Sequence, residues 1–506
     1  MAKKKVQKKA SKSRTSGRSL RSTRGLSRGF ADVLIGLQYG DEGKARIVDM
    51  LAKDYDVIAR FNGGANAGHT IETKDGGKVA LNQVPSGIFY PEKILYIGSG
   101  CVVNVEKLAI EIEKLKNIKG AGGKPMKIDL SKRLRISCQA SVIQPHHLLI
   151  DAETGKTIGT TKNGIGPCYA DKALRMDGDR LLNIKLGDLL DDPQLYFKKI
   201  RENYLAVCGK YDGGKGLTPA HADLIIATME SFFNRIKDYI EPDTLFLEKK
   251  AQKGAKILFE GAQSIMLDIT KGSVPFVTSS NTVTAAAYVG GDLSPAYHRK
   301  TIGVAKAIMS RVGNGPFASE FGGERSEKYC MATGGDGMSK YPQAVEAKYD
   351  IEKLLSSGDY FDIGVALRVL SYEYGTVSAR PRRVGMFDLV QLKYAILMNG
   401  VNELMINKCD MLNVFARTKR GVLPIVNGYK VDGQTIDYVP GTVKAYYNVK
   451  ADVAYKKCFS ADISGVRKFA KLPKELQGLL KEIESFCGCR IAGVGVGPER
   501  EQFVRI

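Results

Sequence analysis

The sequence predicts an α/β protein with a large, mostly parallel central sheet that is flanked by helices. From Asp32 onward, short apolar runs of strand type alternate with longer segments whose apolar residues recur at helical spacing. This alternation is typical of parallel sheets that carry helices on both faces. Glycine-rich turns follow several of the apolar runs, and ligands of such sheets bind beyond the carboxyl ends of the strands. We therefore expect these turns to build the functional site.

The elements can be assigned in chain order. The first apolar run, residues 32–37, predicts a buried strand. The next segment, residues 44–53, places Ile47, Val48 and Leu51 on one face and predicts a helix. By the same criteria, the other expected strands span residues 56–61, 94–97, 133–137, 256–260, 301–308, 364–369, 402–407 and 490–496. The other expected helices span residues 104–117, 223–240, 282–289, 388–398 and 473–486.

The composition is ordinary for a globular protein, with 43% hydrophobic and 26% charged residues in a chain of 506. No apolar run reaches about 18 residues, so we expect no membrane-spanning helix and no membrane partner. The nine cysteines are scattered, and no CxxC pair or cysteine–histidine cluster has the spacing of a zinc site. Free thiols are typical of a reducing cytosol, which favours a cytoplasmic location.

The net charge of +22 is unevenly distributed, because residues 1–30 contain eleven lysines or arginines and no acid. This segment is also rich in serine and poor in apolar residues, which predicts a disordered basic tail. Weak contact with nucleic acid or another polyanion is the favoured interpretation of the tail. An organellar transit peptide and a nuclear-localisation signal stay open as alternatives.

Residues 31–506 are expected to form the catalytic domain, with two insertions. The first, near residues 208–218, is polar and rich in glycine and lysine. The second, near residues 413–470, has short strand-like pieces and tyrosines among lysines, Tyr446 included. Such a mixture can stack on nucleic acid, but a small surface β-region is the favoured interpretation.

The turn after the first strand is the most informative motif. Residues 38–45 read Gln-Tyr-Gly-Asp-Glu-Gly-Lys-Ala, between a strand and a helix. A glycine-rich turn at this place aims backbone N–H groups at an anion, and Lys44 adds a positive charge for phosphate. Asp41 would repel phosphate unless a cation or a proton transfer needs its carboxylate. This conflict indicates catalysis on a phosphate-bearing substrate, although a tight turn with a capping acid has the same pattern.

A second motif, Asn-Gly-Gly-Ala-Asn-Ala-Gly-His-Thr at residues 62–70, directly follows the strand 56–61. Its small residues let the backbone approach a ligand closely, and Asn66 offers both donors and acceptors. His69 is one of only five histidines, and no apolar face in this loop would bury it. A histidine in such a place is suited to donating a proton to a developing negative charge.

Two further loops carry hydroxyl and amide groups. Residues 159–167, Gly-Thr-Thr-Lys-Asn-Gly-Ile-Gly-Pro, suit a phosphate cradle, although a glycine-rich surface loop explains them nearly as well. The run Phe-Glu-Gly-Ala-Gln ends a strand at Gln263, which can contact a base edge or stabilise an oxyanion. Thr278, within Val-Thr-Ser-Ser-Asn, is a candidate for binding phosphate.

Two motifs in the C-terminal half predict a binding site for a nucleoside triphosphate. Residues 375–385 contain Arg380, Arg382 and Arg383 in one predicted loop. The forked guanidinium group of arginine suits carboxylates and phosphates. A solvated basic loop is the alternative interpretation. Residues 407–410, Asn-Lys-Cys-Asp, match the NKxD pattern by which GTPases read guanine. The aspartate accepts from N1 and the exocyclic amine of guanine, a pair of donors that adenine lacks.

Taken together and in this order, the motifs resemble those of the adenylosuccinate synthetase family. GDEGK, NAGHT, FEGAQ, VTSSN, RVGNGPF and GPER follow the family's order from about Val33 to the C-terminus, outside the two insertions. The resemblance implies a large, mostly parallel sheet wrapped by helices, distantly similar to the P-loop GTPases. It also implies a homodimer.

The activity that the resemblance implies is the GTP-dependent ligation of L-aspartate to IMP, a step of AMP biosynthesis that forms a C–N bond. Asp41 would take the N1 proton of IMP, and the 6-oxygen would attack the γ-phosphate of GTP to give 6-phosphoryl-IMP. His69 would stabilise that oxygen and act as an acid. The amino group of aspartate would then displace phosphate, leaving adenylosuccinate, GDP and phosphate.

The resemblance also implies a role for individual residues. The catalytic group would comprise Asp41, Lys44, His69 and Gln263, and Mg²⁺ would be held by the Asp41 side chain and the Gly68 carbonyl. IMP would contact Asp41, Asn66, Thr161, Gln263, Thr278, Arg380 and Arg175, the last reaching across the dimer into the partner's site. L-Aspartate would be held by Thr376, Val377, Ser378, Arg380 and Arg382. GTP would contact Gly40, Gly43, Lys44, Gly68, Thr70, Arg382, Lys408, Asp410, Gly495 and Gly497.

Several positions depart from the family's pattern. Tyr39 replaces a tryptophan, and Arg46 replaces a common lysine, which alters the phosphate contacts. Asn163 stands where bacterial members have arginine, which weakens the phosphate assignment of that loop. Gly495 replaces a serine near the guanine and removes one side-chain contact.

Two alternatives to IMP ligation are open at this stage. A viral-type relative joins aspartate to dGMP, and such relatives can alter the GDEGK acid or prefer ATP, whereas this chain keeps Asp41 and the NKxD pattern. The other alternative is a non-catalytic derivative that binds nucleic acid through its basic tail. The presence of Asp41, Lys44 and His69 argues against it.

Overall fold

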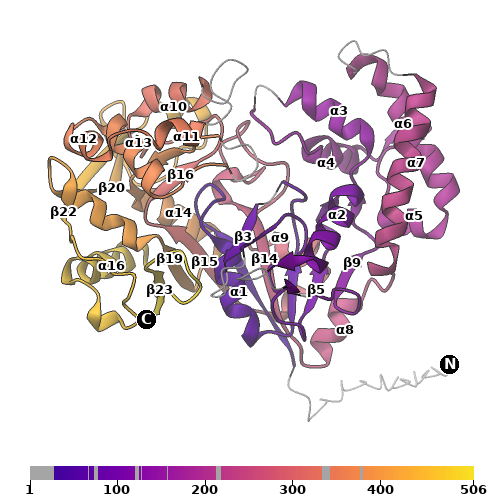
Figure 1. The fold of residues 1–506 in the computed structure, drawn as a ribbon, viewed down its shortest axis with the longest axis horizontal. Helices are drawn as coiled ribbons and strands as arrows, with labels where there is room; N and C mark the ends of the chain where they lie inside the picture. Colours follow the sequence, from indigo (N-terminus) through magenta and orange to yellow (C-terminus); the bar gives the residue numbers. More distant parts are fainter. Residues whose placement is uncertain are drawn as a thin grey trace, which may run out of the picture.

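The computed structural model describes residues 28–66, 68–72, 78–119, 125–126, 128–155, 158–211, 218–332, 342–375 and 380–506. Its centre is a ten-stranded sheet with helices on both sides (Figure 1). All pairs of neighbouring strands are parallel except the last, β23 with β24. In spatial order the strands are β13 (Ile240–Glu241), β9 (Leu134–Ser137), β5 (Ile94–Ile97), β2 (Val57–Arg60), β14 (Lys256–Ser264), β1 (Phe30–Gly36), β15 (His298–Lys306), β19 (Glu403–Asn407), β23 (Arg490–Gly495) and β24 (Phe503–Arg505).

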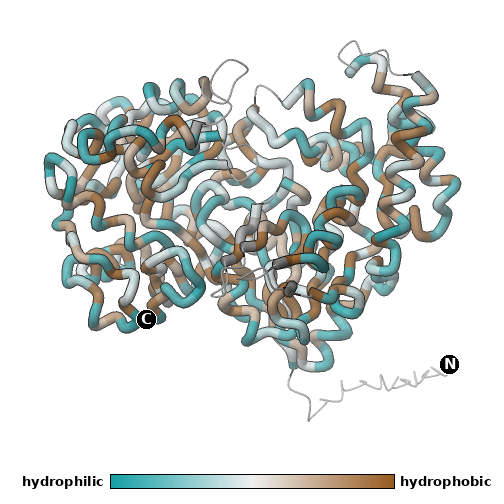
Figure 2. Tube along the Cα trace, in the orientation of Figure 1, coloured by the Kyte–Doolittle hydropathy of each residue, from teal (hydrophilic) through white to brown (hydrophobic). Residues whose placement is uncertain are grey.

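Helices cover both faces of this sheet, as the sequence predicts. The helices of the described residues are α1 (Lys44–Leu51), α2 (Val105–Lys116), α3 (Pro145–Thr154), α4 (Ile165–Leu174), α5 (Leu186–Asp191), α6 (Pro193–Tyr211), α7 (Pro219–Ile236), α8 (Phe246–Gln252), α9 (Ala286–Gly290), α10 (Gly323–Ala332), α11 (Pro342–Glu346), α12 (Ile351–Ser356), α13 (Tyr360–Leu370), α14 (Leu389–Asn399), α15 (Val443–Tyr447) and α16 (Lys474–Cys487). Apolar and polar residues alternate along the outer helices α6 and α7 (Figure 2). This pattern is expected of helices that bury one face and expose the other.

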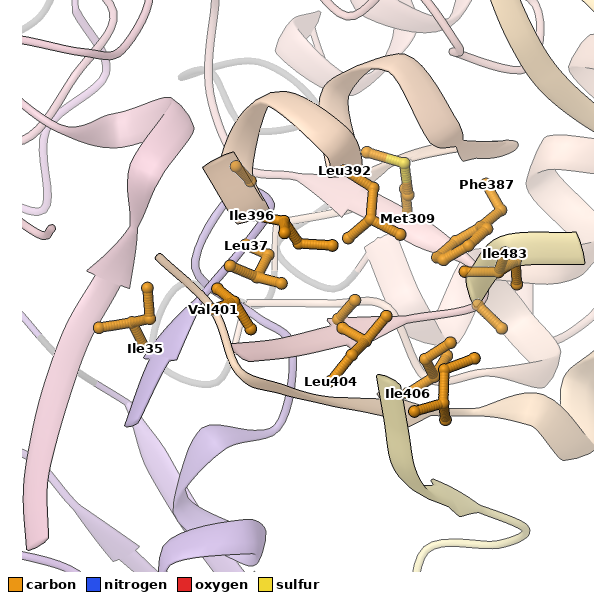
Figure 3. Packing of buried hydrophobic residues seen from close by; sticks show 14 of the residues in the cluster. Ile35, Leu37, Met309, Phe387, Leu392, Ile396, Val401, Leu404, Ile406 and Ile483 are labelled. Atoms are coloured by element: carbon orange, nitrogen blue, oxygen red, sulfur yellow. The ribbon is translucent and has the colours of Figure 1, made fainter. Parts of the chain in front are cut away.

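The central strand β1 sends its side chains alternately into two hydrophobic cores. Leu34 packs in the core that contains Ile47 and Val48 of α1. Ile35 belongs to the opposite core, together with residues of α14, α16 and β19 that converge in Figure 3 (Leu392, Ile396, Ile483, Leu404 and Ile406). Because both faces of the strand are buried, β1 has no polar alternation, and its sequence is apolar apart from Asp32, whose buried carboxylate pairs with Arg299.

The second predicted insertion forms a β-structure that packs into the protein. In it, β20 (Val422–Val431) pairs with β21 (Gln434–Ile436), β22 (Lys450–Lys457) and β18 (Phe387–Asp388). The expected β-region is therefore present, but it is more than a surface feature, since Ile425 and Tyr446 are buried. The Tyr446 hydroxyl lies 3.4 Å from that of Tyr39 in the turn after β1.

Smaller two-stranded pairings complete the structure. They are β3 (His69–Glu72) with β4 (Lys78–Leu81), β6 (Val102–Val103) with β10 (Ser141–Val142), β7 (Ile118–Lys119) with β8 (Pro125–Met126), β11 (Met176–Asp177) with β12 (Arg180–Leu181), and β16 (Met309–Arg311) with β17 (Arg383–Gly385).

One expected strand, residues 364–369, is wrong, because these residues lie inside helix α13. The Asp359 side chain accepts a hydrogen bond from the Phe361 backbone and caps this helix at its N-terminus. Residues 363–368 are buried without interruption, so the segment has no polar face. A short apolar run of this kind does not distinguish a buried helix from a buried strand. The expected helix 282–289 is reduced to the short α9, whereas the other expected elements are present near their predicted bounds.

Parts of two expected regions lie outside the described residues. For the basic tail these are residues 1–27, and the description begins at Arg28, whose guanidinium lies 4.5 Å from the ring centroid of Tyr297. For the insertion near 208–218, the residues outside the description are 212–217, between the end of α6 and the start of α7. Among the helices that the structure describes, none combines the length and apolarity needed to cross a bilayer.

A buried histidine pair joins α3 to α4. His146 and His147 both place Nε2 near the Asp171 carboxylate, at 2.9 and 3.0 Å. The backbone N–H of Gln144 donates to Nδ1 of His147 at 3.0 Å, so the proton of this neutral ring lies on Nε2 and points to Asp171. A metal ion at Nε2 would have to displace that proton, and the group is therefore a hydrogen-bonded anchor. Burial lowers the pKa of His147 to about 4.

We expect Leu404→Ala to lower the free energy of unfolding by about 2–5 kcal/mol, because Leu404 is fully buried in β19 and its removal leaves a cavity. Leu397→Ala is the matched control, since Leu397 is 63% exposed on α14 and should change stability by less than about 0.5 kcal/mol. Urea unfolding followed by circular dichroism measures both. Equal effects of the two changes would contradict the position of β19 in the core.

The low pKa of His147 predicts a loss of stability in mild acid. Between the unfolded pKa of 6.5 and the folded pKa of about 4, the unfolded chain binds more protons than the folded one. Stability therefore falls as the pH drops through this window, and His147 contributes on the order of 2 kcal/mol of the fall between pH 7 and pH 5. His147→Gln should remove that part, whereas His221→Gln, at an exposed histidine on α7, should not. Urea midpoints at the two pH values test this expectation.

Candidate active site

The turn after β1 lies at the centre of the sheet, between β1 and α1. Its glycines Gly40 and Gly43 have φ angles of 107° and 81°, which favour residues without a side chain. Gly36, at the end of β1, is also required, because a Cβ there would lie 1.8 Å from Oγ of Ser264 and 2.4 Å from Oε2 of Glu42. The turn is therefore pressed closely against the end of β14.

A buried acid, Glu42, holds this turn from inside. Its Oε1 accepts hydrogen bonds from the backbone N–H groups of Gln38 and Gly40, at 3.0 and 2.8 Å, and from the Ser264 hydroxyl at 2.6 Å. Two N–H groups of the turn are thus bonded to Glu42, a contact that the expected anion-binding turn did not include. The sequence analysis missed Glu42, although its place beside the catalytic candidate Asp41 was the available signal.

The lysine of the turn is paired within the site. Lys44 is 3% exposed, and its Nζ lies 2.7 Å from Oε2 of Glu42 and 2.8 Å from the Gly40 carbonyl. Burial opposes ionisation of Glu42, but the adjacent Lys44 and the hydrogen bonds of the turn hold the pKa of this carboxyl below its usual value. The pair thus holds the buried ammonium group of Lys44 inside the turn.

The end of β14 and the loop after β2 face each other at one side of the turn. Gln263 adopts a positive φ of 56°, and its Cα lies 3.6 Å from the position of a Cβ built on Gly40. A Cβ on Gly63 would lie 3.1 Å from Oε1 of Gln263 and 3.7 Å from Oδ1 of Asn66. Within the described residues, no donor reaches the buried Oε1 of Gln263. The structure therefore brings Gln263 and Asn66 together with an acceptor directed at the site.

Three other predicted residues lie farther out. Thr161 accepts a hydrogen bond from the Asn163 amide at 3.0 Å, in the loop before α4. Thr278 is half-buried, and its backbone N–H donates to the Leu267 carbonyl at 2.8 Å. Arg175 is exposed at the C-terminal end of α4, with a φ of 68°. It extends from a helix end that the Asp171–histidine group anchors.

On the other side of the turn, Arg382 forms ion pairs with two acids, Asp41 and Glu373. Nε of Arg382 lies 3.1 Å from Oδ2 of Asp41, whose side chain is 26% exposed. Nη1 of the same guanidinium lies 2.8 Å from Oε2 of Glu373, a fully buried acid that the sequence analysis missed. Arg380 is half-buried at the neck of the same loop, where its carbonyl accepts from the Gly375 N–H at 2.8 Å.

The guanine-type motif follows β19 and is joined to the turn after β1. Nδ2 of Asn407 donates to the Glu42 carbonyl at 2.7 Å, and Lys408 donates to Glu373 at 2.5 Å. Burial raises the pKa of Asp410, against the opposing effect of Lys408 and Arg46. No donor from the described part of the chain reaches the buried Oδ1 of Asp410.

Arg46 and Gly495 depart from the family pattern together. The Arg46 guanidinium donates to the carbonyls of Glu499 and Gln502, at 2.6 and 2.7 Å, and so ties α1 to the loop after β23. A Cβ on Gly495 would lie 3.1 Å from Nη1 of Arg46 and 2.8 Å from Oδ1 of Asn407. The arginine thus occupies the space beside a glycine. A Cβ on Gly497 would likewise meet the Gln502 side chain at 2.3 Å.

The remaining predicted residues are only partly described. Gly68 is exposed, and His69 and Thr70 begin strand β3, but the side chains of these two residues are outside the description. Thr376, Val377 and Ser378 also lie outside the described residues.

Comparisons with known proteins identify the family and its fold. A family model described as adenylosuccinate synthetase matches residues 33–504. Adenylosuccinate synthetase 2 of Cupriavidus pinatubonensis is 45% identical over 474 residues, which cover 94% of this chain and 97% of the relative. The solved structure of a fully ligated adenylosuccinate synthetase from Plasmodium falciparum matches with a TM-score of 0.77 and 28% identity, over 94% of this chain and all of that one.

A more distant solved structure shows the same fold. The succinoaminodeoxyadenylate synthetase of cyanophage S-2L, solved with dGMP bound and dATP as its energy donor, has a TM-score of 0.53 and 19% identity, over 94% of this chain and 95% of that one. The alternative that the chain ligates dGMP is therefore not favoured over ligation of IMP. The chain belongs to the adenylosuccinate synthetase family, the GTP-dependent ligases that join aspartate to IMP in purine biosynthesis.

Proposed function

We propose that this chain joins L-aspartate to IMP at the turn after β1, with Asp41 as the base and GTP as the phosphoryl donor. The observation that carries the proposal is the junction of two sequence motifs. Asn407, the first residue of the guanine-type motif, donates to the Glu42 carbonyl in the Asp41 turn at 2.7 Å. A guanine read by Asp410 would therefore direct its phosphates toward the same turn that carries the base.

The first chemical step transfers a proton and a phosphoryl group. Asp41 accepts the N1 proton of IMP, which places negative charge on the 6-oxygen. That oxygen attacks the γ-phosphorus of GTP, its bond to the β-phosphate oxygen breaks, and GDP leaves. His69 is the donor that we assign to the 6-oxygen. The product is 6-phosphoryl-IMP.

In the second step, the amino group of aspartate attacks C6 of this intermediate. The C6–O bond breaks, inorganic phosphate leaves with the oxygen, and the amine loses a proton. Phosphorylation is needed because an unmodified purine 6-oxo group is a poor leaving group. We assign the aspartate to Thr376, Val377, Ser378, Arg380 and Arg382, since arginine forks match carboxylates.

The guanine assignment is supported by the acceptor that Asp410 offers. Its Oδ1 is buried, and no donor from the described residues reaches it. Guanine would supply N–H donors from N1 and from its amino group, whereas adenine would present an acceptor at N1. Lys408, Gly495 and Gly497 would complete the guanine site, and Thr70 would lie toward the phosphates.

The phosphates are assigned to the turn itself. Gly43 and the N-terminus of α1 supply backbone N–H groups, whereas the N–H of Gly40 is already bonded to Glu42, and Lys44 and Arg382 supply positive charge. Lys44 is bonded to Glu42 and Arg382 to Glu373, so both cations are already oriented. Orientation before binding reduces the entropy that phosphate binding would otherwise lose.

The donor set also fits Mg²⁺. The Asp41 carboxylate is partly exposed and Gly68 is exposed, so a carboxylate oxygen and a carbonyl oxygen can be offered at the phosphate end of the site. When bound, the ion would neutralise charge on the transferring phosphoryl group. Mg²⁺ normally keeps water and phosphate oxygens among its ligands, so two protein ligands suffice.

The proposed IMP site extends from Gln263 and Asn66 to the outer loops. The free acceptor of Gln263 would face the purine, and Thr161, Thr278 and Arg380 would hold its ribose phosphate. Arg175 would complete the site from a second subunit, which makes the homodimer part of the proposal. Its exposure at the C-terminal end of α4 supports a contact outside its own subunit.

The proposal treats residues 31–506 as the catalytic domain and the basic tail of residues 1–30 as an accessory. The location that we propose is the cytoplasm, because all nine cysteines are free thiols. The tail would add weak contacts with polyanions.

The function is tested by phosphate release and product analysis with L-aspartate across IMP, dGMP, GTP and ATP. We expect succinylated product only when IMP and GTP are supplied together. Turnover of dGMP with ATP, at a rate equal to or above that of IMP with GTP, would overturn the assignment of substrate.

Asp41→Asn should lower kcat at least about a hundredfold, since the carboxylate is the proposed base and an amide of the same size takes up no proton. Steady-state phosphate release at saturating substrates is the measurement. Asp54→Asn serves as the control and should retain activity, because Asp54 is an exposed acid that follows the C-terminal end of α1. Turnover of Asp41→Asn within a few-fold of the unmodified enzyme would remove Asp41 from the first step.

Asp410→Asn should reduce the preference for GTP over ATP at least about tenfold, because the amide replaces one acceptor of the guanine donors with a donor. The preference is the ratio of kcat/KM for the two nucleotides. Asp432→Asn, in the exposed turn between β20 and β21, is the control and should keep the ratio. An unchanged ratio in Asp410→Asn would refute the guanine assignment.

A further inference from the structure

One buried carboxylate connects the proposed phosphate and guanine contacts. Glu373 follows α13, and its side chain is completely buried. Its two oxygens receive four donors from separate segments. These donors are Lys408 at 2.5 Å and Lys306 at 2.8 Å on Oε1, and Arg382 at 2.8 Å and the Ser310 hydroxyl at 2.9 Å on Oε2.

The backbone of Glu373 adds to this junction. Its N–H donates to the Arg368 carbonyl at 2.9 Å, which fixes it to the end of α13. Its carbonyl accepts from the N–H of Arg382 at 2.9 Å, so the residue also closes the neck of the loop that carries Arg380 and Arg382. Both backbone groups of the residue are thus fixed, and the four side-chain donors hold its carboxylate.

Electrostatics require an acid at this place. Lys306 is 1% exposed, and burial lowers its pKa to about 8. Although burial opposes ionisation of Glu373, Lys306, Lys408 and Arg382 hold the pKa of its carboxyl well below the usual value. Without the carboxylate, three cations would share a low-dielectric region and repel one another.

We propose that Glu373 is a positioning residue for GTP, which fixes Lys408 over the guanine and Arg382 at the γ-phosphate with a single carboxylate. This inference rests on the proposed function, because Lys408 and Arg382 are assigned there to the two ends of GTP. Glu373 itself is buried and touches no substrate. It acts through the two cations, and Lys306 and Ser310 hold it in place.

The same carboxylate connects the nucleotide to the base. Arg382 lies between Glu373 and Asp41, because its Nη1 donates a hydrogen bond to Glu373 and its Nε lies 3.1 Å from Oδ2 of Asp41 in an ion pair. A guanidinium is planar, so fixing Nη1 also fixes the direction of Nε. Movement of Arg382 therefore changes its distance from Asp41, and Glu373 limits that movement. We expect loss of Glu373 to affect GTP binding first and IMP binding little.

Direct binding measurements on Glu373→Gln test the inference. GDP, a non-hydrolysable GTP analogue and IMP are each titrated into the variant and into the unmodified enzyme by isothermal titration calorimetry. We expect about a tenfold loss of affinity for GDP, through Lys408, and about a hundredfold loss for the GTP analogue, through Lys408 and Arg382 together. The affinity for IMP should change less than about threefold. Glu373→Asp keeps the charge on a shorter side chain, and its losses should fall between those of Glu373→Gln and the unmodified enzyme.

A matched control separates positioning from general destabilisation. Asp32→Asn also removes a fully buried carboxylate, one that pairs with Arg299 at the opposite end of β1. It should lower the melting temperature as Glu373→Gln does, while the affinities for GDP and the GTP analogue stay unchanged. Should Glu373→Gln not fold, the same titrations on Glu373→Asp decide.

Three results would overturn the inference. They are unchanged affinity of folded Glu373→Gln for the GTP analogue, tighter binding of that analogue through relief of the negative charge, and an equal loss for IMP. These results leave the proposed function intact as long as the unmodified enzyme ligates IMP. Absence of ligation by the unmodified enzyme would instead refute the proposed function, whatever the variants bind.

Discussion

Buried cations at the carboxyl ends of the central strands need buried carboxylates, and this pairing determines the geometry of the site. Lys44 pairs with Glu42, and Lys306, Arg382 and the half-buried Lys408 pair with Glu373. A lone charge in such surroundings would be strongly destabilising, so each acid and its cations have to be placed together. The turn after β1, the end of β19 and the loop after α13 are thereby held in one fixed arrangement before any substrate binds.

The pairing also explains why a parallel sheet carries this chemistry. The strands β1, β14, β15 and β19 are neighbours, and their carboxyl ends meet at one edge. Polar groups of the site lie at these strand ends, such as Gln263 near the end of β14 and Asn407 at the last position of β19. The hydrophobic layers beneath, shown in part in Figure 3, keep these strand ends in register. Precision at the site therefore depends on packing well below it.

The sequence was sufficient for the sheet, for most of its flanking helices and for the motifs that converge on the turn. Strand periodicity and glycine-rich turns are local signals, and the folded protein contains most of the strands and the turns that these signals predicted. Residues 364–369 were misassigned because an entirely buried helix has no polar face. Glu42 and Glu373 were missed for a different reason. Glu42 has local partners in the turn, but its bond to Ser264 joins segments that are far apart in the chain, as the bond between Glu373 and Lys306 does, and no local pattern reveals such distant partners.

The contact between Arg46 and Gly495 couples two positions that lie far apart in the sequence. Arg46 donates to two carbonyls of the loop after β23, and a Cβ at position 495 would lie 3.1 Å from its Nη1 and 2.8 Å from Oδ1 of Asn407. The serine of the family pattern would therefore crowd both the arginine and Asn407. Whatever residue stands at position 495 is thus constrained by the residue at position 46, and a change at one of the two sites has to be judged together with the other.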